Sequence, residues 1–145
     1  MSGRAAAEAG VVVKMYTRDI VILANSRKIG GRCIAGKGMN SGEWVRIINR
    51  LDSRGNTVPF TDSDLKRLCG NKIEPSLFTC FRINFKRKCG IYCQPENELI
   101  SGGSWKYLKK ISYNELNKFM DTKCPRWLGY FGFGNMDNIP LSICN

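Results

Sequence analysis

Short stretches in which apolar and polar residues alternate are the feature that most restricts how this chain can fold. In residues 77–85 the side chains of Phe81, Ile83 and Phe85 share one face, and polar residues fill the positions between them. A period of two residues is that of a β-strand with one buried face. Residues 43–48 repeat the alternation. The sequence therefore predicts a mostly β fold built from short strands.

Two short helices are expected between and after these strands. The first starts at Thr61, with Gly70 as its stop, because Thr is a good N-cap and Gly a good terminator. The second starts at Ser112, and Glu115 three residues later completes a capping box. The sequence thus predicts a small β-barrel with one or two short helices.

The remaining segments are shorter and their boundaries rest on turn residues. We expect a buried strand at 19–24, a basic turn at 25–32, a short strand at 33–35, a loop at 36–42, at most an edge strand at 90–94, an aromatic and glycine-rich tail at 127–134 and a last strand at 141–143. Residues 1–14 are rich in small side chains and are expected to be a disordered or artificial extension, which leaves 15–145 as the domain. No stretch approaches the roughly 18–20 apolar residues of a membrane-spanning helix, so no membrane contact is expected.

Charge points to an acidic partner. The 145 residues include 23 Lys and Arg against 12 Asp and Glu, a net charge of +11. An excess of this size attracts polyanions whatever the fold that carries it. Nucleic acid is the commonest such partner, with an acidic protein or an anionic membrane surface as rivals. A basic surface that serves only solubility also stays open.

The residue types that are absent weigh against catalysis. The chain has no histidine, which excludes a His general base, Ser–His and Cys–His nucleophile pairs and mixed Cys/His zinc sites. A Cys-only zinc site needs two close pairs, and among the seven cysteines only Cys89 and Cys93 form one. Their odd number and scattered spacing favour reduced, mostly buried thiols in a cytoplasmic protein. We expect no metal, no cofactor and no enzymatic activity.

The first candidate site is the loop of residues 25–37. The adjacent Gly30 and Gly31 allow backbone N–H groups to converge on an anion. The loop lacks the endings of a P-loop and of a dinucleotide fingerprint. Four cations lie around it: Arg27, Lys28, Arg32 and Lys37. A flexible turn with solvated charges beside it is an equally supported interpretation.

Two strands supply further candidates. Trp44 and Arg46 share a strand face, where an aromatic ring can stack on a base and a guanidinium can hold a phosphate. A core Trp with Arg46 at its rim is the alternative, and it is somewhat favoured. A third candidate is the basic patch of Arg82, Lys86, Arg87 and Lys88, which suits backbone phosphates but also fits an ordinary solvated strand end.

Several segments carry a common pattern in a fixed order: residues 22–28 and 31–36, the Gly-Glu-Trp-Val-Arg segment at 42–46, the Gln-Pro-Glu-Asn segment at 94–97 with Trp105, and residues 134–141. Together they resemble the bacterial dual OB-containing domain family, with Met136 where an Asp is usual. The resemblance covers about residues 18–143. It implies OB-type barrels and a nucleic-acid or nucleotide-binding role in bacterial cells. The family pattern continues with a further β-rich stretch, so we expect a second barrel to be absent, cut off or abbreviated.

The combined prediction is a non-catalytic nucleic-acid-binding module with an OB-like barrel, which contacts phosphates through the Gly-rich loop and the basic strand. A module that senses a nucleotide or another phosphate ligand in the same loop is the alternative. A nuclease-like or deaminase-like enzyme ranks third, because Glu96 has no second carboxylate placed by spacing to assist it. For residues 94–97 a turn pinned by side-chain bonds to the backbone is expected instead. DNA, RNA, nucleotide and protein ligands stay open, as does the oligomeric state.

Overall fold

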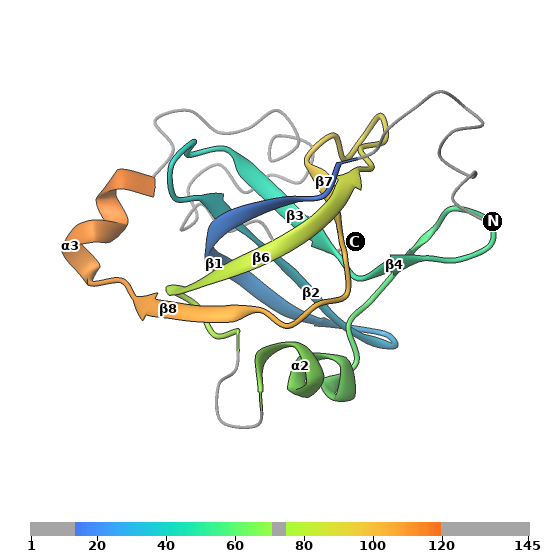
Figure 1. The fold of residues 1–145 in the computed structure, drawn as a ribbon, viewed down its shortest axis with the longest axis horizontal. Helices are drawn as coiled ribbons and strands as arrows, with labels where there is room; N and C mark the ends of the chain where they lie inside the picture. Colours follow the sequence, from blue (N-terminus) through green and yellow to red (C-terminus); the bar gives the residue numbers. More distant parts are fainter. Residues whose placement is uncertain (1–13, 71–74, 120–145) are drawn as a thin grey trace.

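The computed structural model describes residues 14–70 and 75–119 (Figure 1). Its strands are β1 (Tyr16–Lys28), β2 (Gly31–Gly38), β3 (Trp44–Ile48), β4 (Arg50–Leu51), β5 (Thr57–Val58), β6 (Thr79–Lys88), β7 (Asn97–Ile100) and β8 (Lys106–Lys110). The helices of the described residues are α2 (Asp62–Cys69), α3 (Tyr113–Leu116) and a 3₁₀ turn, Asn117–Phe119. The predicted mostly β fold with short helices is confirmed.

Five strands close into a barrel in the order β1-β2-β3-β7-β6, and β6 pairs with β1 to complete the ring. The 13 residues of β1 allow this closure, because its first half pairs with β6 and its second half with β2. A register shift between Ile22 and Ala24 marks a bulge, which bends a strand from one partner to the next. β3 and β7 run parallel, and β8 joins β6 outside the ring. This closed ring is an OB-like barrel.

The inside of the barrel is the main core. The inward side chains of β6 are Phe81, Ile83 and Phe85, as the alternation predicts, and none of them is exposed to solvent. Phe60 and Trp105 meet edge to face with ring centroids 5.7 Å apart. The full cluster consists of Ile20, Ile22, Ile34, Val45, Ile47, Phe60, Leu65, Leu68, Cys69, Phe81, Ile83, Phe85, Ile100 and Trp105. Burial of these apolar side chains is the main force that holds the ring closed.

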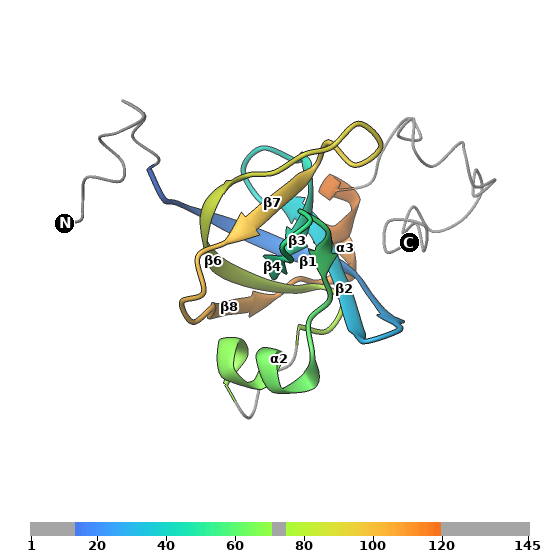
Figure 2. The same cartoon turned by 90° about the vertical axis from the view of Figure 1, so that its right-hand side faces the viewer.

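Helix α2 packs beneath the barrel (Figure 2). The Thr61 hydroxyl accepts a hydrogen bond from the Asp64 N–H, and the Asp64 carboxylate accepts one from the Thr61 N–H, each at 3.0 Å. The N–H of Gly70 donates to the Lys66 carbonyl and ends the helix. Leu65 and Leu68 face the core. The predicted start and stop are therefore confirmed.

A second apolar cluster lies outside the ring. Val21 and Leu23 on the outer face of β1 pack with Cys80, Ile111 and Phe119. The last two come from the segment after β8, where Ser112 and Glu115 form the predicted capping box of α3. In Figure 1, α3 lies beyond the end of β8. This part of the barrel's outer surface is therefore covered by the chain itself.

Three strand predictions are corrected. β1 continues to Lys28, so the turn predicted at 25–32 comprises only residues 29 and 30. β2 spans eight residues rather than three, because pairing with β1 and β3 satisfies its backbone despite its glycines. Residues 90–94 contain no strand, and a single bridge joins Ile91 to Gln94. The predictions for residues 1–13, 127–134 and 141–143 lie outside the described residues.

Candidate functional site

The cations of the β1–β2 hairpin do not converge on one point. Arg27 and Lys28 are successive strand residues, so their side chains leave opposite faces of β1. Arg27 is exposed and Lys28 is half-buried. Ile29, at the tip of the turn, is 97% exposed. The hairpin therefore presents an apolar tip with one cation on each side.

Gly31 lies where two chain segments approach each other too closely for a side chain. The Phe60 carbonyl accepts a hydrogen bond from the Arg32 N–H at 2.7 Å, and the Phe60 N–H donates to the Arg32 carbonyl at 3.0 Å. A Cβ on Gly31 would collide with that Phe60 carbonyl oxygen. Gly30 has a positive φ of 90°, as a tight turn requires. These contacts support a structural turn at Gly30 and Gly31 rather than an anion nest.

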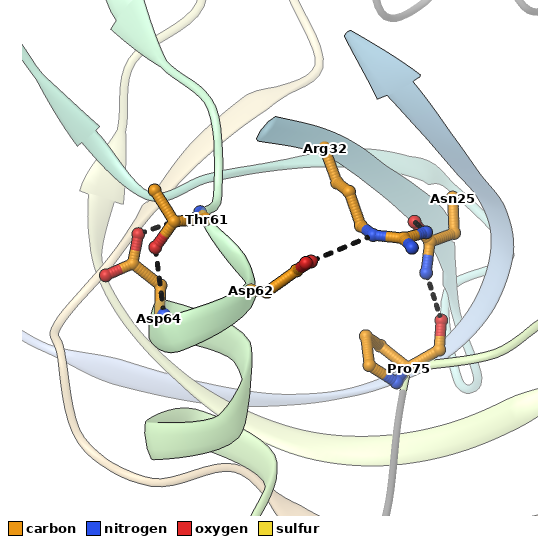
Figure 3. Close-up of polar contacts among 6 residues, drawn as sticks. All are labelled: Asn25, Arg32, Thr61, Asp62, Asp64 and Pro75. Carbon is orange, nitrogen blue, oxygen red and sulfur yellow. Dashed lines mark hydrogen bonds and ion pairs between the residues drawn. The ribbon is translucent and has the colours of Figure 1, made fainter. Parts of the chain in front are cut away.

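Arg32 points toward the start of α2 (Figure 3). Its Nε lies 3.4 Å from the Asp62 carboxylate, and its Nη1 donates to the Asn25 side-chain oxygen at 3.3 Å. The Asn25 amide in turn donates to the Pro75 carbonyl at 2.9 Å. Arg32 is thus bound within the chain, joining β2 to α2.

Lys37 is not an exposed cation. Only 3% of the residue is accessible, and its Nζ donates to the Phe119 carbonyl at 2.7 Å. The same Nζ lies 5.2 Å from the centroid of the half-buried Trp44 ring. The ammonium group is held against the outer face of β2 rather than exposed in a loop, and its predicted contact with an anion stays a prediction.

Arg46 is also buried, at 3% exposure. Its Nη1 donates to the Gln94 side-chain oxygen at 2.9 Å and lies 3.4 Å from that of Asn97, and its Nη2 lies 3.7 Å from the Cys33 sulfur. The predicted stacking and phosphate surface of Trp44 and Arg46 is therefore corrected. The guanidinium lies along the sheet and ties β3 to the segment before β7.

Glu96 lies in the same segment. Its Oε1 is buried and forms no hydrogen bond with the described residues. Burial raises the pKa of this carboxyl above its ordinary value, and the Arg46 charge offsets part of the effect. The turn is held by side-chain bonds, such as Asn97 Nδ2 to Gln94 Oε1 at 3.2 Å, in addition to a backbone bond from Asn97 to Gln94.

Exposed cations gather instead on the outer face of β6 and β8. The burial pattern of β6 alternates, so Arg82, Asn84 and Lys86 point outward. Lys106 of β8 lies directly opposite Arg82 in the strand register. We call the following residues the β6–β8 basic strip: Arg82, Lys86, Arg87, Lys88 and Lys106. All five are exposed.

Among the described residues, four members of the strip have no ion-pair partner. Arg82 binds Asp19, with its Nε 2.8 Å from Oδ1 and its Nη2 3.1 Å from Oδ2. The other members form no ion pair with any carboxylate of residues 14–70 and 75–119. Sequence reasoning found the β6 members and missed Lys106, because only the pairing of β6 with β8 brings it beside Arg82.

A pocket of about 260 Å³ adjoins the strip. Its lining comes from β1, β6, the end of β2 and the turn that follows it, namely Thr17, Arg18, Asp19, Gly38, Asn40, Ser41 and Arg82. Sequence reasoning missed it, because Arg18 and Asp19 lie at the start of a strand and Ser41 in a turn. Nothing in their spacing shows that they meet.

In the described part of the chain, no three Cys, Asp or Glu side chains lie close enough to hold a metal ion. None of the helices there is long and apolar enough to cross a membrane.

Comparison with known proteins agrees with the barrel. No curated protein and no solved structure matches the chain significantly. The family model described as the dual OB-containing domain matches residues 18–142. This range includes all five strands of the closed ring apart from the first two residues of β1. The chain therefore belongs to the dual OB-containing domain family.

Proposed function

We propose that this protein is a non-catalytic nucleic-acid-binding module that contacts phosphates through the β6–β8 basic strip. The observation that supports it is the row of exposed cations without ion-pair partners among the described residues. Lysine and arginine in this state bind phosphate oxygens by charge-assisted hydrogen bonds and release counterions. OB barrels are a common scaffold for oligonucleotide binding, which adds support at the level of the fold.

The placement of the ligand on β6 and β8 follows from burial. OB barrels commonly bind oligonucleotides on the face of their second and third strands. In this chain the outward residues Lys37 and Arg46 of that face are each only 3% exposed. Phosphates need accessible cations, and the strip brings five exposed ones together on two neighbouring strands. The strip also includes four of the cations that the sequence predicts for binding, Arg82, Lys86, Arg87 and Lys88.

A salt-titrated binding assay tests the proposal. A fluorescent mixed-sequence oligonucleotide, offered as single-stranded DNA, single-stranded RNA and duplex, is expected to bind with a log Kd that rises with log salt. On a single strand each phosphate contact contributes about 0.7 to the slope. Replacing Lys86, Lys88 and Lys106 together by Gln should therefore reduce the slope by about 2. The oligonucleotide should be recovered intact after incubation with Mg²⁺.

The control variant removes two positive charges at another place in the fold. Arg27→Gln with Lys28→Gln alters the β1–β2 hairpin, which was the other predicted phosphate site, and should leave the slope close to that of the unchanged protein. If the hairpin variant loses the slope and the strip variant keeps it, the ligand lies on the hairpin. If no nucleic acid binds at low salt, the proposed function is wrong.

A further inference from the structure

The pocket beside the basic strip contains two arginines that carboxylates hold in place from one side. The Arg18 Nη1 lies 2.6 Å from Oε2 of Glu98, and the Arg82 Nε lies 2.8 Å from Oδ1 of Asp19. Both guanidinium groups line the same pocket. A guanidinium has five N–H donors in a planar fork, so a carboxylate on one edge leaves donors on the other.

Arg18 is set by buried groups. Glu98 is only 4% exposed, and its second oxygen accepts a hydrogen bond from the Tyr16 hydroxyl at 2.7 Å. Burial and the Glu98 carboxylate raise the pKa of Tyr16, so the phenol stays protonated and remains the donor. The Arg18 Nη2 donates to Ser41 Oγ at 2.9 Å across the pocket. This side chain is therefore oriented before any ligand arrives.

Gly38 makes room for that orientation. A Cβ on Gly38 would lie 2.5 Å from Ser41 Oγ and 2.8 Å from the Arg18 Nη2, and both contacts are too close. Any larger residue would displace the two donors. The absence of a side chain at position 38 thus keeps the floor of the pocket open.

Arg82 completes the donor set from the opposite strand. Its Nε and Nη2 are used by Asp19, and its Nη1 has no hydrogen-bond partner among the described residues. The hydrogen bond from Arg82 holds the pKa of Asp19 below its usual value, so the carboxylate stays ionised and keeps the pair together.

We propose that this pocket binds a terminal phosphate monoester, at the end of a nucleic-acid strand or on a free nucleotide. The inference deepens the proposed function and rests on it for the strand. A monoester carries close to two negative charges, whereas an internal phosphodiester carries one. Two oriented guanidinium groups suit the more highly charged group. A pocket of about 260 Å³ accepts a phosphate with part of its nucleotide but not a duplex.

Oligonucleotides that differ only at their ends test the pocket. One short single strand is prepared with a 5′-phosphate, with a 3′-phosphate and with two hydroxyl ends, and its Kd is measured by fluorescence anisotropy. One of the phosphorylated strands should bind about tenfold more tightly than the hydroxyl form, which is the effect of one added charge-assisted contact. Equal Kd values for all three strands would overturn the proposal.

Variants assign the effect to the pocket. Arg82→Gln should remove the preference for the terminal phosphate, and Gly38→Ala, which leaves every charge in place, should weaken it. The control Lys106→Gln should weaken the binding of all three oligonucleotides by the same factor and keep the preference for the terminal phosphate. If Arg82→Gln keeps the full preference, the terminal phosphate binds elsewhere.

Thermal shift separates this inference from the proposed function. Inorganic phosphate and a nucleoside monophosphate should each raise the Tm of the unchanged protein, but not that of Arg82→Gln. If these probes raise the Tm but no oligonucleotide binds, the pocket is a nucleotide site and the proposed function is wrong. An equal shift with acetate would show that the pocket accepts carboxylates and would reject its preference for phosphate.

Discussion

At the scale of single residues, Gly31 and Gly30 are adjacent glycines with different roles, and this gives a paired prediction. Gly31→Ala should lower the free energy of unfolding by about 2 kcal/mol or more, because its Cβ would collide with the Phe60 carbonyl that holds β2 to the start of α2. Gly30→Ala should cost about 1 kcal/mol, since the nearest atom is 4.0 Å away and only its positive φ is strained. Urea denaturation of both variants measures the difference.

The same pair tests the alternative role of this turn. If Gly30 and Gly31 formed an anion nest, both variants would weaken oligonucleotide binding more than they weaken the fold. We expect the reverse, with the affinity of the folded protein unchanged in Gly30→Ala. If Gly30→Ala loses affinity for the oligonucleotide while its free energy of unfolding is unchanged, an anion nest is the better interpretation of this turn.

Other single residues show where sequence reasoning reaches its limit. Arg46 stands in an alternating strand pattern that is typical of a half-exposed face, and Lys37 stands in a predicted glycine-rich loop, so the sequence alone gives no sign that either is buried. Their burial depends on Phe119 and on residues 94–97, which meet them only through tertiary contacts. Lys86 and Lys88 lie at a strand end, where exposure follows from local position, and the same reasoning was correct for them. Charge and alternation can therefore identify candidate cations but not their accessibility.

At the scale of elements, the capping box of α2 can be tested by itself. Thr61→Ala removes the hydroxyl that accepts from the Asp64 N–H, and it should lower the free energy of unfolding by about 1 kcal/mol. Ser63→Ala is the matched control, because Ser63 is exposed in the first turn and alanine favours the helix. The midpoint of urea unfolding should fall for Thr61→Ala and stay or rise for Ser63→Ala. Equal midpoints would show that the cap contributes nothing to the fold.

Elements that are defined by local signals were recovered from the sequence, and those defined by pairing were not. Both capping boxes and the inward face of β6 depend on residues within a few positions of one another. The closure of the ring depends instead on β1 and β6, where Ile20 pairs with Phe81, and on the parallel pair of β3 and β7. No local pattern encodes these partners. The short strands and helices predicted a small barrel, and the resemblance to a family implied its OB type.

At the scale of the whole molecule, two carboxyl groups should give the stability opposite dependences on pH. The hydrogen bond from Arg82 lowers the pKa of Asp19 below its ordinary value of 3.8, so its stabilising effect is present above that value and is lost as the pH falls through the lower folded pKa. Burial raises the pKa of Glu96 above 4.5. The folded protein therefore favours the protonated carboxyl, and ionisation of Glu96 at higher pH lowers the free energy of unfolding. The first group favours folding at neutral pH, and the second opposes it.

Two amide variants separate these contributions, because an amide cannot ionise. At neutral pH, Asp19→Asn should unfold at a lower urea concentration than the unchanged protein, and Glu96→Gln at a higher one. Both differences should shrink as the pH falls to about 3, where the carboxyl groups gain their protons and come to resemble the amides. The measurement is the urea midpoint of all three proteins at several pH values between these limits. If the urea midpoint of Glu96→Gln at neutral pH lies below that of the unchanged protein, the ionised Glu96 carboxylate has a stabilising partner. Desolvation alone would then not describe the effect of this buried carboxyl on stability.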